Sequence, residues 1–244
     1  MDAIEVKTAC RHLPLLATHP WWLIAASRGG RVGLLTRMVA DSIRSVRSRA
    51  IPKSLDSLVS QSPCSPLGKM GATQEKLYFL VRMFKPATVV ETGVFRGISS
   101  AFILAALTDN EKGKLYSIDL PNADYQVPDG RDTKSPLKGK EDVGFAVPKM
   151  LKQNWELLLG DSKVLLPQLL SRLDSVDLFY HDSDHSYAFM KWEFAQVYPR
   201  IPFGGFLTSD DVQWNTAFDE FVHDGDYAWI GILGGRLGIA QKGH

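Results

Sequence analysis

Short apolar runs and longer stretches with the length and spacing of helices alternate along the chain from residue 71 onward. The apolar runs are rich in β-branched residues and end in polar ones, which is typical of buried strands. They cover 87–93, 114–120, 155–161, 176–182 and 204–211. The helical stretches cover 73–84, 98–109, 162–173, 186–201 and 216–225. This alternation predicts an α/β domain with a doubly wound, mostly parallel sheet.

The end of the chain breaks this alternation. Two further strands, 227–233 and 236–242, follow each other with only Gly234 and Gly235 between them. Parallel neighbours need a long crossover connection, whereas antiparallel strands can be joined by a two-residue turn. We therefore expect a C-terminal antiparallel hairpin.

Residues 1–70 are predicted to form an N-terminal helical appendage and linker before the domain at 71–244. Apolar residues in 28–49 recur at steps of three and four, and 50–70 is rich in Ser and Pro. The helix either packs on the domain or on the second subunit of a homodimer, or it lies on a membrane surface. In the latter case residues 13–49 make a peripheral membrane contact.

A long polar segment, 121–147, interrupts the domain after the second predicted strand. It is full of Pro, Gly and charged residues. Loops of this length in compact domains are usually lids or disordered. The segment leaves the strand at its carboxyl end, where ligands bind in such sheets. It is either a lid over a substrate or an insertion without a role in binding.

Composition and charge narrow the function classes. The 244 residues are 45% hydrophobic, and the net charge of +1 gives no sign that nucleic-acid binding is the main role. Two cysteines, Cys10 and Cys64, are too few for a disulfide framework or a zinc knuckle. The apolar stretch 13–27 is too short to span a bilayer and is broken by His19 and Pro20. We expect a cytoplasmic protein.

Polar residues follow every predicted parallel strand at its carboxyl end, the edge where functional residues of open α/β sheets gather. Taken singly, each has an ordinary structural explanation, such as a turn glycine or an aspartate that caps a helix. Five strands with the same arrangement indicate a shared site. In strand order the residues are Glu91 and Gly93, Asp119, Asp161 and Ser162, Asp182, Asp184 and His185, and Asp210 and Asp211.

The turn after the first strand, ETGVFRGISS at 91–100, carries the most specific pattern. Its glycines, Gly93 and Gly97, do not have the spacing of the dinucleotide-binding fingerprint, which disfavours an NAD-dependent oxidoreductase. Acid-x-Gly-x-x-x-Gly with a second acid, Asp119, ending the next strand resembles motif I of the class I S-adenosylmethionine-dependent methyltransferases. The resemblance implies a Rossmann-like fold, with Glu91 near the methionine amino end of the cofactor and Asp119 at its ribose hydroxyls.

Three later segments are similar to those of metal-dependent O-methyltransferases, both the catechol and caffeoyl-CoA type and the bacterial sugar and macrolide type. LLLGDSKVLLPQL at 157–169 resembles their third-strand segment, which borders the adenine. DLFYHDSDHSY at 177–187 resembles their metal motif, and GGFLTSDDV at 204–212 their fifth-strand motif. The resemblance covers 71–242. The cofactor-binding residues that it implies are Glu91, Gly93, Phe95, Gly97, Ser99, Asp119, Asp161 and Ser162.

The same resemblance implies a divalent metal and a catalytic base. All-carboxylate ligation suits a hard cation, and we expect Mg²⁺. His185 falls at the position of the general base, which is a Lys in the catechol enzymes and a His in the bacterial sugar enzymes. The implied catalytic residues are His185 and Asp182. The implied metal ligands are Asp182, Asp210 and Asp211.

Two residues of the fourth-strand segment are left over. We expect Asp184 either to orient His185 or to lie in the outer shell of the metal. We expect His181 to pack at the end of the strand rather than to contact a substrate.

The predicted function is methyl transfer from S-adenosylmethionine to a hydroxyl of a small molecule or sugar (EC 2.1.1.-), assisted by Mg²⁺ with His185 as base. Three alternatives stay open. The first is a metal-free methyltransferase with His185 alone as base. The second is a non-methylating metal enzyme of the same fold, similar to the cephalosporin-hydroxylase-like proteins. The third is a binding or scaffold protein with an inactive pocket.

Overall fold

The computed structural model describes residues 72–121, 137, 139–233 and 236–243. The appendage expected at 1–70, with the membrane contact expected at 13–49, lies outside these residues, as does most of the lid expected at 121–147. None of the helices in the described ranges is long and apolar enough to cross a membrane.

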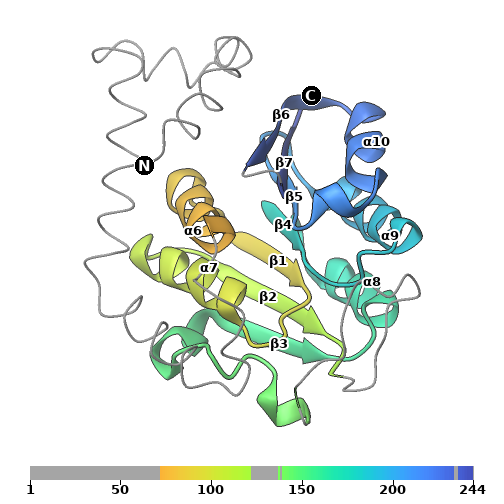
Figure 1. Cartoon of the computed structure of the whole chain (residues 1–244). Helices are drawn as coiled ribbons and strands as arrows, with labels where there is room; N and C mark the ends of the chain where they lie inside the picture. Colours follow the sequence, from red (N-terminus) through yellow and green to blue (C-terminus); the bar gives the residue numbers. More distant parts are fainter. Residues whose placement is uncertain (1–71, 122–136, 138, 234–235, 244) are drawn as a thin grey trace, which may run out of the picture. The chain divides into compact units, whose positions relative to one another are not determined.

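The described residues form one seven-stranded sheet, whose order is β3-β2-β1-β4-β5-β7-β6 (Figure 1). Strands β1 to β5 are parallel, and β7 is antiparallel to both of its neighbours. The chain order reverses beside β1, the place where ligands bind in sheets of this kind. The strands are β1 (Thr88–Thr92), β2 (Lys114–Asp119), β3 (Trp155–Leu159), β4 (Leu178–His181), β5 (Phe206–Ser209), β6 (Tyr227–Leu233) and β7 (Leu237–Lys242).

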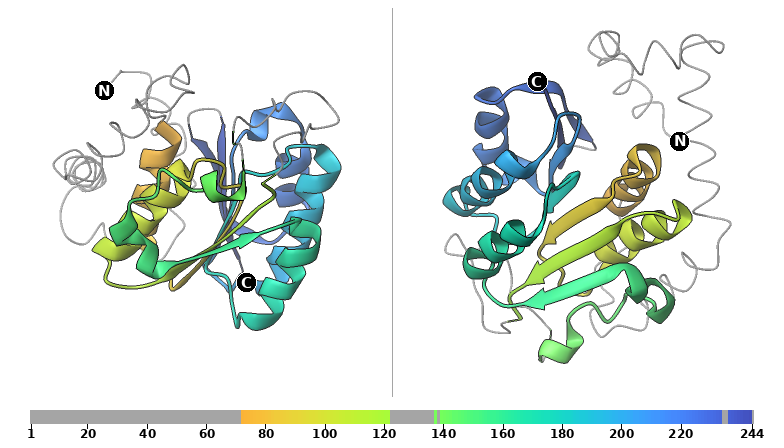
Figure 2. Two further views of the ribbon diagram at one scale, coloured as in Figure 1. Left: turned by 90° about the horizontal axis from the view of Figure 1, so that it is seen from below. Right: turned by 180° about the vertical axis from the view of Figure 1, so that it is seen from behind.

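Helices cover both faces of the sheet, as the two views of Figure 2 show. One face carries α6 (Ala72–Phe84) and α7 (Ile98–Asp109). The other carries α8 (Ser162–Arg172), α9 (Tyr187–Val197) and α10 (Ala217–His223). Short 3₁₀ turns complete the connections: η1 (Lys140–Asp142), η2 (Lys149–Asn154), η3 (Tyr198–Arg200) and η4 (Val212–Trp214).

The packing of the core explains why apolar runs in the sequence predict the strands correctly. Every residue of β4 and of β5 is buried, because a parallel strand between two helical layers has no solvent face. Phe179 of β4 and Leu207 of β5 pack with Phe194 of α9 and Phe218 of α10 in one hydrophobic cluster. The predicted Rossmann-like α/β fold is confirmed. The helix predicted at 186–201 is shorter than expected, because it becomes the 3₁₀ turn η3 around Pro199.

The predicted C-terminal hairpin is confirmed, but its place in the sheet differs from chain order. Strand β7 pairs with β5 on one side and with β6 on the other. The later strand of the hairpin therefore lies inside the sheet, and the earlier one forms the edge. This insertion brings the start of β7 next to the carboxyl end of β5.

Candidate active site

The loop between β1 and α7 turns through three residues with a left-handed backbone. Gly93, Phe95 and Gly97 have φ values of 83°, 51° and 84°. Glycine enters this region without steric cost. At Gly93 a side chain is also excluded by contact, because a Cβ atom there would lie 1.9 Å from the backbone oxygen of Asp182. Glycine at this position therefore lets the loop touch the carboxyl end of β4.

Asp119 at the end of β2 holds this loop from the other side. Its Oδ2 atom accepts hydrogen bonds from the amides of Val94 at 2.7 Å and Phe95 at 2.8 Å. Burial raises the pKa of the Asp119 carboxyl, and the two amide donors oppose that rise. In the described part of the chain, its Oδ1 atom has no hydrogen-bond partner. The structure thus brings Asp119 into contact with the glycine loop after β1, and the sequence pattern points to both of these features.

Glu91 in β1 is fully buried beneath the loop. Its carboxylate accepts hydrogen bonds from the hydroxyls of Ser99 at 2.6 Å, Ser100 at 2.6 Å and Ser117 at 2.7 Å. Burial raises the pKa of Glu91, and the three hydroxyl donors oppose the rise. Glu91 therefore ties β1 to the first turn of α7 and to β2. Its contact with a cofactor, and that of Ser99, stay predictions.

Arg96 belongs to the same loop and brings a buried cation to it. The residue is 3% exposed. Within the described ranges, its Nε and Nη2 atoms have no hydrogen-bond partner. A buried charged donor without an acceptor is costly. The guanidinium of Arg96 is therefore suited to an anionic group of a ligand.

The described end of the expected lid packs on the loop. The amides of Gly144 and Ala146 donate to the backbone oxygens of Phe95 and Arg96, both at 2.9 Å. A Cβ atom on Gly144 would lie 2.3 Å from the ring of Trp155, so the close packing there needs glycine. This part of 121–147 is fixed against the loop, and the lid role of the segment stays a prediction.

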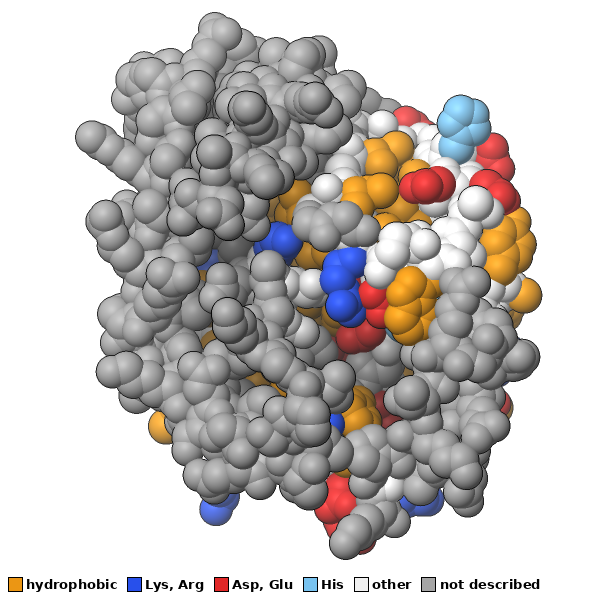
Figure 3. All heavy atoms as spheres, viewed as in Figure 1, with side chains coloured by type: hydrophobic (Ala, Val, Ile, Leu, Met, Phe, Trp, Pro, Cys, Tyr) orange, Lys and Arg blue, Asp and Glu red, His pale blue; other side chains and the backbone are white. Residues whose placement is uncertain are grey.

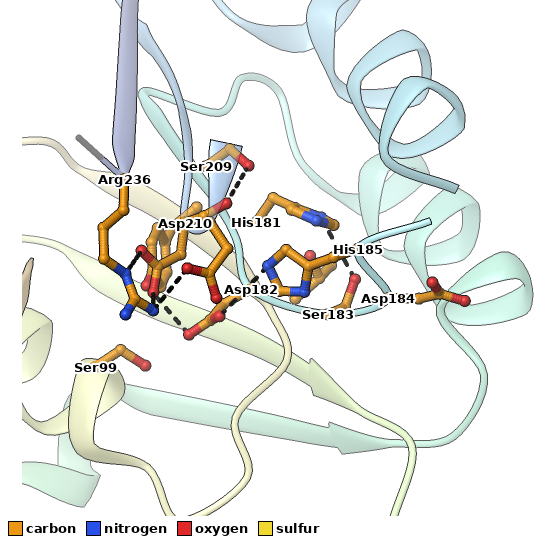
Figure 4. A network of polar contacts seen from close by, with 12 residues as sticks. Ser99, His181, Asp182, Ser183, Asp184, His185, Ser209, Asp210 and Arg236 are labelled. Carbon is orange, nitrogen blue, oxygen red and sulfur yellow. Dashed lines mark hydrogen bonds and ion pairs between the residues drawn. The ribbon is translucent and has the colours of Figure 1, made fainter. Parts of the chain in front are cut away.

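Across the loop from Asp119, strands β4 and β5 end in an aspartate cluster, which consists of Asp182, Asp210 and Asp211. Arg236, directly before β7, reaches into it (Figure 4). Its Nε atom donates to Asp210 Oδ1 at 2.8 Å and its Nη2 atom to Asp210 Oδ2 at 2.6 Å. Nη2 also lies 3.1 Å from Asp211 Oδ1. Figure 3 shows basic and acidic side chains in contact on the face seen in Figure 1.

The close approach of like charges raises the proton affinity of the cluster. Burial and the neighbouring Asp210 raise the pKa of Asp182 well above its usual range, although 30% of its side chain is exposed. Burial and Asp210 also raise the pKa of Asp211, and Gln213 and Arg236 oppose this rise. One guanidinium therefore compensates only part of the repulsion among three carboxyls.

His185 lies beside the aspartate cluster, in the loop between β4 and α9, and is 3% exposed. Its Nε2 atom is 3.9 Å from Asp182 Oδ1, which is longer than a hydrogen bond. Its ring centre lies 4.9 Å from that of Trp214 and 5.1 Å from that of His181. The structure thus places the two expected catalytic residues as neighbours. The role of His185 as base stays a prediction.

A second buried network lies behind His185. Glu193 of α9 is fully buried. It accepts hydrogen bonds from Thr92 Oγ1 at 2.7 Å and Ser162 Oγ at 2.8 Å, and its Oε2 atom lies 2.7 Å from His181 Nδ1. Burial lowers the pKa of His181, and Glu193 opposes this. His181 is thus packed at the end of β4, and the hydroxyl of Ser162 points to Glu193 rather than outward.

Two of the sequence-selected aspartates make local turn contacts. Asp161 is the N-cap of α8, and its Oδ1 atom accepts from the amide of Lys163 at 2.8 Å. Asp184 Oδ1 accepts from the amide of Ser186 at 2.8 Å. In Figure 4 the carboxylate of Asp184 points away from the aspartate cluster. The adenine contact expected of Asp161 and the roles expected of Asp184 stay predictions.

The expected magnesium ligands do not form an open ligand set. Both oxygens of Asp210 accept hydrogen bonds from Arg236, which also contacts Asp211. In the part of the chain that the structure describes, no three His, Cys, Asp or Glu side chains are grouped so as to hold a metal ion. The residues as arranged do not fit a metal ion. The magnesium site is therefore not confirmed.

Three residues of this edge were not selected from the sequence: Arg96, Glu193 and Arg236. Glu193 had a usable signal, because it stands among apolar residues of a predicted helix and a charged group on a buried face needs partners. Arg96 lies inside the glycine motif, so its position was a signal as well. Arg236 gave none beyond its place next to a glycine turn.

A family model described as a methyltransferase domain matches residues 90–212, which is half of the chain. The matched range begins in β1 and ends in η4. It therefore includes the glycine loop, Asp119, the aspartate cluster and His185. No curated protein matches the chain.

Solved structures share the fold at low sequence identity. A methyltransferase from Geobacter sulfurreducens has a TM-score of 0.56 at 15% identity, over 80% of this chain and 89% of that one. The O-methyltransferase TomG from Streptomyces achromogenes, solved with SAM, has a TM-score of 0.56 at 15% identity, over 78% and 90%. The methyltransferase PaMTH1 from Podospora anserina, bound to SAH, has a TM-score of 0.54 at 12% identity, over 80% and 88%.

Proposed function

The chain belongs to the methyltransferase-domain family, and from this premise we propose that it transfers a methyl group from S-adenosylmethionine to a hydroxyl of a small molecule or sugar. The family match supports the reaction class. The solved O-methyltransferase TomG, which shares the fold and holds SAM, is a reason to choose this cofactor and an oxygen acceptor.

The observation that carries the proposal is the loop between β1 and α7. Asp119 fixes it through the amides of Val94 and Phe95. Gly93 brings it into contact with the backbone of Asp182, next to His185. A cofactor on this loop would therefore lie between a residue suited to its ribose and the residues suited to an acceptor.

The chain offers partners for both polar ends of the cofactor. Asp119 keeps its Oδ1 atom for the ribose hydroxyls, because only Oδ2 holds the loop. Arg96 has two buried donors without partners in the described ranges, and these would bind the methionine carboxylate. The N-terminus of α7, which has no side-chain cap, would add to that attraction.

S-adenosylmethionine supplies an electrophilic methyl group on a sulfonium. The residues of the chain hold the acceptor oxygen in line with this methyl, and the closeness of the two reactants provides most of the rate gain. His185 takes the proton from the acceptor hydroxyl as the oxygen–carbon bond forms and the sulfur–carbon bond breaks, which leaves S-adenosylhomocysteine. Asp182, 3.9 Å from His185 Nε2, stabilises the imidazolium that results. No step of this reaction passes through a metal ion.

Calorimetric titration with S-adenosylmethionine tests the cofactor. Asp119→Asn keeps an acceptor for the loop amides but removes the charge, and we expect binding to weaken by about ten-fold to a hundred-fold. Arg96→Met is expected to have an effect of similar size. Asp219→Ala, at an exposed position on α10, is the matched control and should bind like wild type. A wild-type protein that does not bind S-adenosylmethionine would overturn the proposal.

The base is tested once phenols and sugars have been screened for release of S-adenosylhomocysteine. His185→Ala is expected to lower kcat by about 10²-fold to 10⁴-fold. Its affinity for S-adenosylmethionine should stay unchanged, because His185 lies on the acceptor side. Full activity in this variant would assign the proton transfer to another group.

A further inference from the structure

Arg236 has the contacts of a built-in counter-ion. Its guanidinium meets Asp210 side-on through two hydrogen bonds of 2.8 Å and 2.6 Å. The same nitrogen that makes the shorter bond reaches Asp211 Oδ1 at 3.1 Å. Paired, nearly parallel bonds of this kind are the strong form of arginine–carboxylate contact. Asp210 and Asp211 are two of the three carboxylates that the sequence resemblance implies as metal ligands.

The backbone holds Arg236 in place. Its carbonyl oxygen accepts from the amide of Val212 at 3.0 Å, and Ser209 pairs with Gly238 in the β5–β7 ladder. Asp210 is held as well, since its amide donates to the carbonyl of His181 at 2.9 Å. Both partners therefore start from fixed backbone positions. The pair does not depend on the chance orientation of a long surface side chain.

The charge of Arg236 is permanent, because a guanidinium does not lose its proton in proteins. Asp210 is 2% exposed, so its carboxylate has little water to stabilise it and needs a cation. A divalent ion on Asp210 would have to displace the guanidinium and leave Arg236, which is 48% exposed, beside a second positive charge. These contacts favour the guanidinium of Arg236 over a divalent ion as the cation bound to Asp210.

We infer that Arg236 takes the place of a metal ion and keeps the aspartate cluster closed to divalent cations. The proposed methyl-transfer site is then metal-independent, and Arg236 is the cation that holds Asp210 and Asp211 in position. The statement that the site is metal-independent rests on the proposed function. The exclusion of divalent cations does not, because it is a property of the folded protein.

A Mn²⁺-binding experiment on the full chain tests the inference. Binding is measured as the decrease of the free-ion signal in electron paramagnetic resonance. Wild type is expected to leave the signal unchanged at protein concentrations well above that of the ion. Arg236→Met removes the positive charge. This variant should gain one Mn²⁺ site, with an affinity for Mn²⁺ at least ten-fold higher than that of wild type. Adding Asp210→Asn to this variant should abolish the site. Arg200→Met, at an exposed position in η3, is the matched control and should behave as wild type.

Two results would overturn the inference. One is stoichiometric Mn²⁺ binding by wild type that Asp210→Asn abolishes. The other is a folded Arg236→Met variant, shown by circular dichroism, that gains no site. The wild-type measurement can overturn the inference even if Arg236→Met does not fold. Since no S-adenosylmethionine or acceptor is present, the outcome is separate from the success or failure of the proposed methyl transfer.

Discussion

Buried carboxylates lie on both sides of the loop between β1 and α7, and the two sides stabilise these carboxylates in different ways. On the β2 side, Glu91 is fully buried, and within the described ranges its carboxylate meets only the neutral hydroxyls of three serines. On the β4–β5 side, the nearly buried Asp210 meets the guanidinium of Arg236. Both arrangements satisfy the oxygens, but only the second supplies an opposite charge.

The difference indicates what each side is built for. Serine hydroxyls are short, and they fix Glu91 against α7 and β2, which gives the loop its shape. Arg236 is half-exposed and long, so it can meet a ligand while it stays bound to Asp210. We therefore expect substitutions on the β2 side to act on stability, and those on the β4–β5 side to respond to salt and ions.

Gly93→Ala should have the largest effect, because it separates the two sides. The new Cβ atom would lie 1.9 Å from the backbone of Asp182, at a φ of 83°. We expect a loss of about 3 kcal/mol or more in the free energy of unfolding, measured in urea, from the left-handed backbone and overpacking together.

Gly204→Ala is the control for that substitution. Its φ of 78° is similar, but the nearest atom to a new Cβ is 3.8 Å away. It should lose only about 1 kcal/mol to 2 kcal/mol, from the backbone alone. Equal losses in the two variants would show that the close approach of loop and β4 is unimportant.

Glu91→Gln tests the neutral-donor side through pH. Burial raises the pKa of Glu91 in the folded protein above its ordinary 4.5. Its contribution to stability is therefore complete below that ordinary value and is lost as pH rises through the raised pKa. The glutamine does not titrate. We expect the variant to lose about 1 kcal/mol to 2 kcal/mol at acid pH, and less at neutral pH.

Urea unfolding of both proteins at a series of pH values measures this difference. Subtracting the two curves removes the other carboxyls, which are common to both. A penalty that grows with pH would mean that the serines lower the pKa of Glu91 by more than burial raises it.

Arg236→Met should have the smallest effect on stability and the clearest dependence on salt. The arginine side of the pair with Asp210 is 48% exposed, so water can enter the space that the guanidinium leaves and hydrate Asp210, and we expect a loss of about 1 kcal/mol. Raising the salt from about 0.1 M to about 1 M shortens the Debye length to about 3 Å and should reduce the penalty further. The penalty of Glu91→Gln should not respond to salt. Equal salt responses would remove the contrast between the two sides.

The sequence was sufficient for the fold because each parallel strand is buried on both faces. A strand such as β4, with no solvent face, must be a continuous apolar run, and such runs are visible without a structure. The position of β7 was not visible. Its apolar run looks the same whether it lies at the edge or between β5 and β6, since pairing depends on which strand edges remain open.

The acidic residues of the site were also predictable, for a topological reason. Carboxyl ends of parallel strands lie at one edge, so Glu91, Asp119 and Asp210 had to lie along it. Their partners were not predictable. Arg236 is 26 residues from Asp210 in sequence, and it reaches Asp210 only because β7 is inserted next to β5. The expected metal depended on the family resemblance and on carboxylate chemistry, and neither of them takes this cation into account.

The insertion of β7 also sets an order of assembly during synthesis. A nascent chain has β5 before it has β7, so β5 presents an open strand edge until residues 237–242 leave the ribosome. Over the same interval the aspartate cluster lacks its guanidinium. The last strand of the sheet therefore covers the edge of β5 and brings the guanidinium to the aspartate cluster in one event.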